Sequence, residues 1–247
     1  MTMSTTAVLR SEWIKVRSVR ASAGSLLAVF VVTVSINVLA TAAVGQAEAD
    51  NEGADLLLGA FYALNFGQIA AIAFGTTAVS SEYLNGALRV SLAAVPNRNL
   101  LYAAKMTVVG VLAVVAGQLT SFVTFLSGQA FMGSYALGLG DPGALRACVG
   151  GGLYLALMAL FAAGLTVVLR SAVAVLSLLI PFILIVSFVV GDMAGSVADF
   201  LPDHAGQQVL HQDPAGTLGP WTGLAVTAAW AAATLLAGWW ALRRRDA

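Results

Sequence analysis

The chain has little charge and almost no cysteine. Of its 247 residues, 10% are charged, two are histidine and one is cysteine, whereas 59% are hydrophobic. A soluble domain usually carries about a quarter charged residues, and a chain with so few could not cover a water-facing surface without large apolar patches. One cysteine, Cys148, excludes an intrachain disulfide. With a mean hydropathy of +0.88, the composition predicts an integral membrane protein and not a soluble enzyme.

Motifs for nucleotide binding and hydrolysis are also lacking. The sequence has no G-x-x-x-x-G-K-[ST], G-x-S-x-G or H-E-x-x-H, and its two lysines, Lys15 and Lys105, follow no phosphate-binding loop. His204 and His211 lie in a segment rich in Pro and Gly, where solvated side chains are more usual than a metal site. A net charge of zero gives no support for nucleic-acid binding. We therefore expect no catalytic residues, metal or cofactor in this chain.

Long apolar runs predict an all-α, polytopic fold that forms a single transmembrane domain over residues 1–247. A bilayer core about 30 Å thick needs roughly 20 apolar residues per helix. A cleaved signal peptide is the alternative for the first run, since Ala40-Thr41-Ala42 resembles a cleavage site, but this run is longer than a usual signal. The six predicted spans are near 23–44, 57–79, 104–132, 147–169, 172–191 and 220–241.

Basic residues alternate between the predicted loops. Eleven of the twelve lie on one side of the membrane if six spans are counted, and Arg146 alone lies on the other. Because basic loops stay in the cytoplasm, both termini are predicted to be inside. The basic residues on that side are Arg10, Lys15, Arg17, Arg20, Arg89, Arg98, Lys105, Arg170, Arg243, Arg244 and Arg245.

The middle of each predicted span contains no ionisable residue, which disfavours a proton-coupled transporter. Uncharged polar residues are present, and two interpretations remain open for them. They form hydrogen bonds between helices, or some of them, namely Asn65, Gln68, Gln118 and Thr124, line a substrate path. Pro181 predicts a kink in the fifth span.

The first 21 residues predict a helix in the membrane interface. Leu9, Trp13 and Val16 recur at helical spacing and form an apolar stripe, whereas Arg10 and Arg17 share another face. A basic flank without helical structure is the simpler alternative.

The cytoplasmic loop 80–103, which follows the second span, is the longest on its side. We expect a short helix over about 82–94 that ends before Pro96, because the residue before a proline disfavours the helical conformation. This helix would turn Glu82 and Arg89 toward the cytoplasm and Leu88 and Leu92 toward the membrane or the bundle. Such a helix suits docking into a groove of a cytoplasmic partner.

The segment Ser81-Glu82-Tyr83, Gly86, Leu88-Arg89, Leu92, Pro96, Arg98 and Lys105 resembles the corresponding loop of exporter-type (type two) bacterial ABC transporter permeases. Glu12-Trp13-Ile14-Lys15 resembles the start of the same proteins. Ala87 departs from the pattern, since relatives often have threonine there. The resemblance implies a coupling helix within 82–98, and it also implies a short re-entrant helix, for which 197–201 is the candidate. The implied coupling residues are Glu82, Tyr83, Gly86, Arg89, Leu92 and Arg98.

The resemblance further implies a permease subunit of an ATP-driven exporter in the bacterial plasma membrane. Its partners would be a separate ATP-binding subunit that holds ATP and Mg, a second permease copy or paralogue, and membrane lipid. Members of this family often export antimicrobial compounds, so the resemblance also implies efflux and antibiotic resistance. The uncharged interior of the predicted spans favours an amphipathic substrate. The alternative is a membrane scaffold that anchors a cytoplasmic complex without transport. No set of residues supports an intramembrane enzyme.

Overall fold

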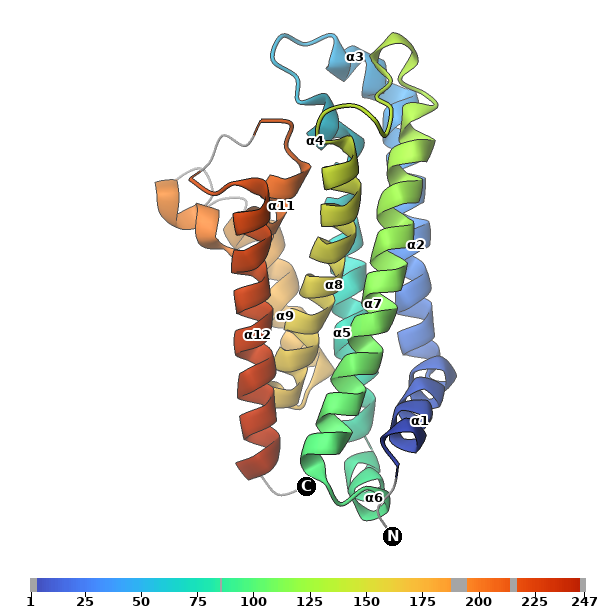
Figure 1. Ribbon diagram of the computed structural model, residues 1–247, viewed down its shortest axis with the longest axis vertical. Helices are drawn as coiled ribbons and strands as arrows, with labels where there is room; N and C mark the ends of the chain where they lie inside the picture. The colour runs from blue at the N-terminus through green and yellow to red at the C-terminus, as the bar shows by residue number, and fades with distance from the viewer. Residues whose placement is uncertain (1–3, 85, 188–194, 214–216, 245–247) are drawn as a thin grey trace.

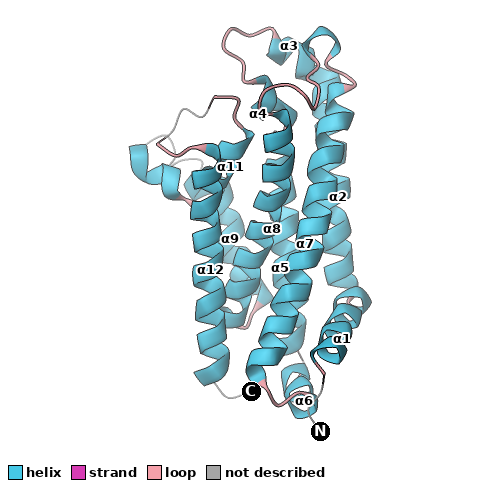
Figure 2. Ribbon diagram, in the orientation of Figure 1, coloured by secondary structure: helices cyan, strands magenta, loops and turns pink. Residues whose placement is uncertain are grey.

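The described part of the chain is a bundle of long helices with short helices at both ends (Figures 1 and 2). The computed structural model describes residues 4–84, 86–187, 195–213 and 217–244, and these contain helices and loops without a strand. Its α-helices are α1 (Thr5–Ser18), α2 (Arg20–Ala40), α3 (Gln46–Ala49), α4 (Leu56–Ala60), α5 (Leu64–Ser80), α6 (Ala87–Ala94), α7 (Arg98–Gln129), α8 (Ala144–Leu169), α9 (Ala172–Pro181), α11 (Pro202–Gln207) and α12 (Pro220–Arg244).

Short 3-10 and π segments join these helices. A π segment, η1 (Thr41–Gly45), carries α2 on into α3, and another, η4 (Phe182–Ser187), follows α9. The predicted kink at Pro181 therefore corresponds to a change from α- to π-geometry, as expected where proline removes a backbone hydrogen bond. The 3-10 segments are η2 (Ser81–Tyr83), η3 (Gly133–Tyr135), η5 (Gly195–Phe200) and η6 (Gln208–Leu210).

Four helical stretches are long and apolar enough to cross a membrane: Arg20–Ala49, Arg98–Gln129, Ala144–Leu169 and Pro220–Arg244. The chain is thus a polytopic membrane protein. The structure differs from the prediction at the second and fifth spans. A turn over residues 61–63 separates α4 from the 17-residue α5, so residues 57–79 are not one helix. Ala172–Ile185 is a shorter apolar helix, and the end of the fifth predicted span lies outside the described residues.

Helix α8 lies at the centre of the bundle and packs against α5, α7 and α12. Two thirds of its most apolar window is buried (67%), against 22% for the α2 window. Glycines allow this packing: a Cβ on Gly75 would clash with the Ala159 backbone, and a Cβ on Gly117 with the Gly152 carbonyl. Backbones without side chains between them can approach closely, which is how membrane helices associate.

The bundle has two distinct ends (Figure 1). The α6 end holds α1, α6 and the last turns of α12, and both chain termini lie there. The α4 end holds α3, α4 and the loop between α7 and α8. The 3-10 segment η5 covers most of the short helix predicted over 197–201, and α11 follows it, packed against α12 and α8. The re-entrant placement of this segment in the membrane stays a prediction.

Candidate functional site

The segment 80–103 folds back across the α6 end of the bundle. It consists of η2, a turn at Gly86, α6, and the Val95-Pro96-Asn97 connection into α7. Gly86 has φ of 73°, a left-handed conformation that suits glycine, and it allows the chain to turn sharply into α6. As predicted, the helix ends before Pro96. The expected start at residue 82 is wrong, since Gly86 interrupts the helix and α6 begins at Ala87.

Helix α7 begins at a defined cap. The Asn97 side chain accepts a hydrogen bond from the Leu100 backbone N–H at 3.1 Å, which satisfies one of the unpaired donors of the first turn. The helix therefore starts at Arg98, six residues before the predicted span. Lys105 consequently lies two turns inside α7, where its side chain is 7% exposed.

Four charged side chains meet between α1, η2 and α7, and we call them the charge square. Lys105 Nζ lies 2.6 Å from Glu12 Oε2 and 2.7 Å from Glu82 Oε1. Lys15 Nζ lies 2.7 Å from Glu12 Oε1 and 3.1 Å from Glu82 Oε1. Each carboxylate thus contacts both ammonium groups, and positive and negative charges alternate around the square.

Ser91 attaches α6 to this arrangement. Its hydroxyl donates to Glu82 Oε2 at 2.9 Å and accepts from Lys15 Nζ at 2.9 Å. Helix α6 places Leu88, Ser91 and Leu92 on the side that faces the bundle. The sequence spacing of 76 residues between Lys15 and Ser91 shows that tertiary folding brings them together.

Burial and pairing have opposite effects on the charges outside the spans. Burial opposes ionisation of Glu82, but the nearby ammonium group of Lys105, and then Lys15, outweigh it and hold the pKa of Glu82 below 4.5. For Lys15, burial acts to lower the pKa, and the hydrogen bond to Glu12 and the charge of Glu82 raise it above 10.5. Both groups are therefore ionised at neutral pH.

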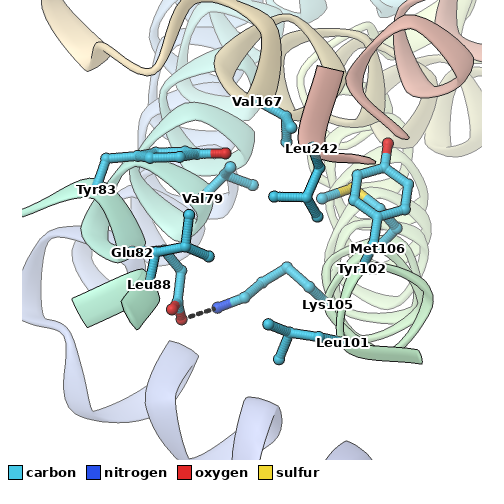
Figure 3. A pocket seen from close by; sticks show the side chains of 10 residues that line it. All are labelled: Val79, Glu82, Tyr83, Leu88, Leu101, Tyr102, Lys105, Met106, Val167 and Leu242. Carbon is cyan, nitrogen blue, oxygen red and sulfur yellow. Dashed lines mark hydrogen bonds and ion pairs between the residues drawn. The ribbon is translucent and has the colours of Figure 1, made fainter. Parts of the chain in front are cut away.

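A small cavity of about 30 Å³ lies beside the Glu82–Lys105 pair (Figure 3). Its walls come from η2, α6 and the α6-end turns of α5, α7, α8 and α12, so it marks where four long helices converge with the loop. Figure 3 shows Leu88 and Leu101 near the ion pair, with Met106 and Leu242 deeper among the helices. The lining is mostly apolar, so the charges of Glu82 and Lys105 have a low-dielectric neighbourhood.

The outward side of the same loop borders an open groove of about 400 Å³. Tyr83, Arg89 and Arg170 line it, and the Arg170 guanidinium lies 5.7 Å from the centre of the Tyr83 ring. Leu84 and Val90 are exposed beside it, at 63% and 72%. Sequence reasoning did not assign these two residues, because exposed apolar side chains are recognised only once the helix faces are known.

Glu82 is the main correction among the predicted coupling residues. It was expected to face the cytoplasm, yet it is 8% exposed and its carboxylate points into the charge square. The fold brings two ammonium groups, those of Lys15 and Lys105, within contact of this carboxylate, so it is buried as a paired ion and not as an isolated charge. Arg89 is exposed, and Leu88 and Leu92 face the bundle, as expected.

The remaining loop residues are tied to the bundle. Arg98 donates from Nη1 to the Leu242 carbonyl at 2.9 Å, so it joins the start of α7 to the end of α12. Tyr83 packs against the core. Glu12, Lys15, Ser91 and Lys105 were not predicted as site residues, although the i,i+3 spacing of Glu12 and Lys15 was a usable signal.

The N-terminal helix is present as α1, with a buried face different from the expected stripe. Val8, Glu12 and Val16 are buried, whereas Trp13 is 39% exposed and Ile14 is 55% exposed. Leu9 is partly buried, and Arg17 is exposed near Trp13. Trp13 faces out because α1 packs along α7 through its other side. Its location in a membrane interface stays a prediction.

The polar residues proposed for a substrate path bond within the chain. Gln68 accepts from the Tyr154 hydroxyl, and Asn65 accepts from Gln207 Nε2 at 2.9 Å. Gln118 donates to the Val149 carbonyl at 2.9 Å, which joins α7 to α8. Thr124 is fully buried, and its carbonyl accepts from Asn37. Their contacts favour helix–helix hydrogen bonding, and a role in a path stays a prediction.

The fold defines a class: a helical polytopic membrane protein whose loop after α5 forms a short helix beside an ion-paired cluster. Residues 8–189 match the family model described as ABC-2 family transporter protein. The chain therefore belongs to the ABC-2 family of transporter membrane proteins, as a permease subunit. Neither the comparison with curated proteins nor that with solved structures gives a significant match.

Proposed function

We propose that this chain forms the membrane path of an ATP-driven exporter and is driven by a separate ATP-binding subunit, which docks on segment 80–103. That subunit would hold the ATP and Mg. The observation that carries this proposal is the outward side of this segment, where Leu84 after η2 and Arg89 and Val90 of α6 are exposed near the groove that Arg170 borders. Apolar side chains next to guanidinium groups are typical of the centre of a protein–protein interface.

The distribution of charge supports a cytoplasmic location for the α6 end. That end holds Arg89, Arg98 and Arg170, while Glu48 and Glu52 lie at the α4 end. Arg243 lies 4.7 Å from the Trp239 ring centre, an arrangement suited to a membrane interface at the end of α12. With α5 and the α9–η4 segment counted as crossings beside the four long helices, the chain has six spans. Both termini then lie inside, in the plasma membrane of a bacterium.

The path itself requires a second chain. Only 22% of the α2 window and 28% of the α12 window are buried, so both helices leave apolar surface for lipid or for a second copy or paralogue. A groove of about 600 Å³ opens at the α4 end beside Asn37, Thr41 and Tyr62 and would form the outer mouth. Its walls combine apolar and polar side chains with the carboxylates of Glu48, Glu52 and Asp55. Such mixed walls suit an amphipathic substrate, which includes the antimicrobial compounds that efflux proteins export.

The experiment that tests docking is co-purification. The tagged chain, extracted in mild detergent from its native membrane, should bring with it a soluble protein with a G-x-x-x-x-G-K-[ST] motif, found by mass spectrometry. Val90→Asp and Leu84→Asp should each weaken this association at least tenfold, about 1.4 kcal/mol or more. The matched control is Leu139→Asp, an exposed leucine in the loop at the α4 end.

Clean isolation of the parent chain after gentle crosslinking, with no ATP-binding protein, would overturn the proposal. The scaffold function would then be favoured if another cytoplasmic protein were recovered through the same residues. Arg89→Ala separates docking from folding, because Arg89 is exposed. It should reduce the ATPase activity of the reconstituted complex while leaving membrane insertion unchanged.

A further inference from the structure

The charge square lies where the docking segment meets the membrane helices, and it deepens the proposed function on which this inference rests. Two of its members, Glu12 and Lys15, come from α1, Glu82 comes from η2, and Lys105 comes from α7. We propose that the charge square joins α1, α6 and the first turns of α7 into one mechanical unit. Force applied to α6 by the ATP-binding subunit then moves α7 as well as α6.

Helix α6 depends on this connection for its position. It has eight residues, too few for a helix that is stable by itself, and Gly86 links it to η2 in a turn with open space around it. Leu88 and Leu92 give it a small apolar contact with the bundle. The directional contacts come from Ser91, which bonds to both Glu82 and Lys15.

Burial makes the square resist separation. The Glu12 side chain is 0% exposed, those of Lys105 and Glu82 are 7% and 10% exposed, and Lys15 is the most exposed at 36%. Moving one element away would leave an ion without its partner in an apolar surrounding, which is far less favourable than moving the paired group as a whole. The square therefore favours joint motion of α1, α6 and α7. Glu12, Lys15 and Lys105 are positioning residues in this mechanism.

The alternation of charge gives the mechanism a distinctive signature. Because each carboxylate contacts both ammonium groups, exchanging Glu82 with Lys105 alone would place like charges together at two of the four contacts, 82 with 15 and 105 with 12. Reversal of all four, by Glu12→Lys, Lys15→Glu, Glu82→Lys and Lys105→Glu, restores four opposite-charge contacts. If these side chains only filled space, the two-residue exchange and the four-residue reversal would not be expected to have opposite effects on the connection between α1 and α6.

A second variant detaches α6 while keeping the remaining charges paired. Lys15→Met with Glu82→Met removes one positive and one negative charge and leaves Glu12 and Lys105 in contact at 2.6 Å. Since no buried ion is left alone, this double variant should fold. It should bind the ATP-binding subunit through the unchanged outward face of α6.

The test measures distances between spin labels in the complex in lipid nanodiscs. Labels at Ile14→Cys and Ala94→Cys report on α1 against α6, and labels at Ala94→Cys and Val173→Cys report on α6 against α9; all three positions are exposed, and none belongs to the proposed docking face. Native Cys148 is buried, and the chain without introduced cysteines gives the background. An excess of unlabelled chain suppresses distances between copies.

In the parent, trapping with ADP and vanadate should change the α6–α9 distance and leave the α1–α6 distance unchanged. In the Lys15→Met/Glu82→Met variant the α1–α6 distance should broaden and shift. The stimulation of ATPase activity by the membrane chain should fall about tenfold. The four-residue reversal should restore the narrow α1–α6 distance and the stimulation.

An unchanged α1–α6 distance in the double variant would overturn the inference, because α6 would then be held by its apolar contacts alone. A parent in which α1 and α6 separate on trapping would overturn it as well. Both results are obtained with the ATP-binding subunit attached. Failure of that subunit to bind the parent would instead contradict the proposed function, so the two failures are distinguishable. The same α1–α6 distance, measured in the parent and the double variant without the ATP-binding subunit, tests whether the charge square holds α6 against α1, whether or not that subunit binds.

Discussion

Polar side chains are buried in two parts of the molecule, and the two parts differ in charge. At the α6 end, two carboxylates and two ammonium groups form the charge square. Toward the α4 end, Asn65, Gln68, Tyr154 and Gln207 form an uncharged cluster that joins α5, α8 and α11. Hydrogen bonds between membrane helices contribute about 0.6 kcal/mol on average, whereas a buried ion without its partner costs several kcal/mol.

This difference indicates that the two ends respond differently to force. The square resists the loss of any single member, because Glu12, Glu82 and Lys105 are buried and the loss of one charge leaves the others unbalanced in an apolar surrounding. The uncharged cluster can exchange partners at little cost, so α11 can shift against α5 and α8. Rigid input at the α6 end and adjustable packing toward the α4 end suit a protein that receives force on one side of the membrane.

The largest expected effect is that of Lys105→Met. It leaves Glu12 and Glu82 with one ammonium group between them, so the folded state should lose about 3–5 kcal/mol. The melting temperature of the detergent-purified protein, followed by size-exclusion chromatography, measures this loss. Arg10→Gln on the exposed face of α1 is the control. Equal melting temperatures for the two variants would contradict the importance of the square.

The next effect concerns the packing of the uncharged cluster. A Cβ on Gly206 would lie well inside the van der Waals contact distance of the Tyr154 ring, so Gly206→Ala should destabilise the fold by about 1–3 kcal/mol. Gly219→Ala meets only Thr222 at an ordinary 3.4 Å and serves as its control. The same melting assay applies. A neutral Gly206→Ala would show that α11 already moves away from Tyr154 freely.

A smaller loss is expected for Tyr154→Phe. The change removes the hydroxyl that donates to Gln68 and accepts from Gln207, and it leaves the ring in place. Because the partners are uncharged, the loss should be about 1 kcal/mol or less. A loss as large as that of Lys105→Met would contradict the contrast between the two ends.

A change of pH near neutrality is expected to have the smallest effect on the stability of the folded state. Since the pKa of Glu82 is held below 4.5 in the folded state, its stabilising contribution is complete above about pH 4.5 and is lost as the pH falls through the lowered value. The raised pKa of Lys15 acts in the opposite range, with its contribution complete below pH 10.5. The melting temperatures of the parent and Glu82→Gln should therefore converge only in acid. A constant difference down to pH 3 would contradict this assignment.

The sequence predicts much of this architecture and misses its contacts for a physical reason. Apolar runs locate α2, α7, α8 and α12, and Pro96 locates the end of α6. The predicted orientation of Glu82 was wrong, because the carboxylate of a residue in a loop is normally expected to face water. Its partner Lys15 lies 67 residues away in the chain, and no local pattern reveals that pairing.

The same limit applies to faces of helices. Leu9, Trp13 and Val16 were assigned to one apolar stripe from their spacing, yet in the fold Val16 is buried against the protein and Trp13 is exposed. Spacing cannot tell a lipid-facing side from a protein-facing side when both are apolar. The turn at residues 61–63 was missed within an apolar run, since Phe61 stacks on Phe125 of α7 at 5.6 Å, a contact formed only in the fold.

Helix α7 runs without interruption for 32 residues, from its Asn97 cap to Gln129. At 1.5 Å per residue it is a rod of about 48 Å, longer than the hydrocarbon core it crosses. A tilt of about 5° pivoting on its first turn would displace the far tip by roughly 4 Å, about the spacing of neighbouring Cα atoms. The length of α7 would therefore convert a small tilt at its first turn into a displacement the size of a residue at the groove beside Met132.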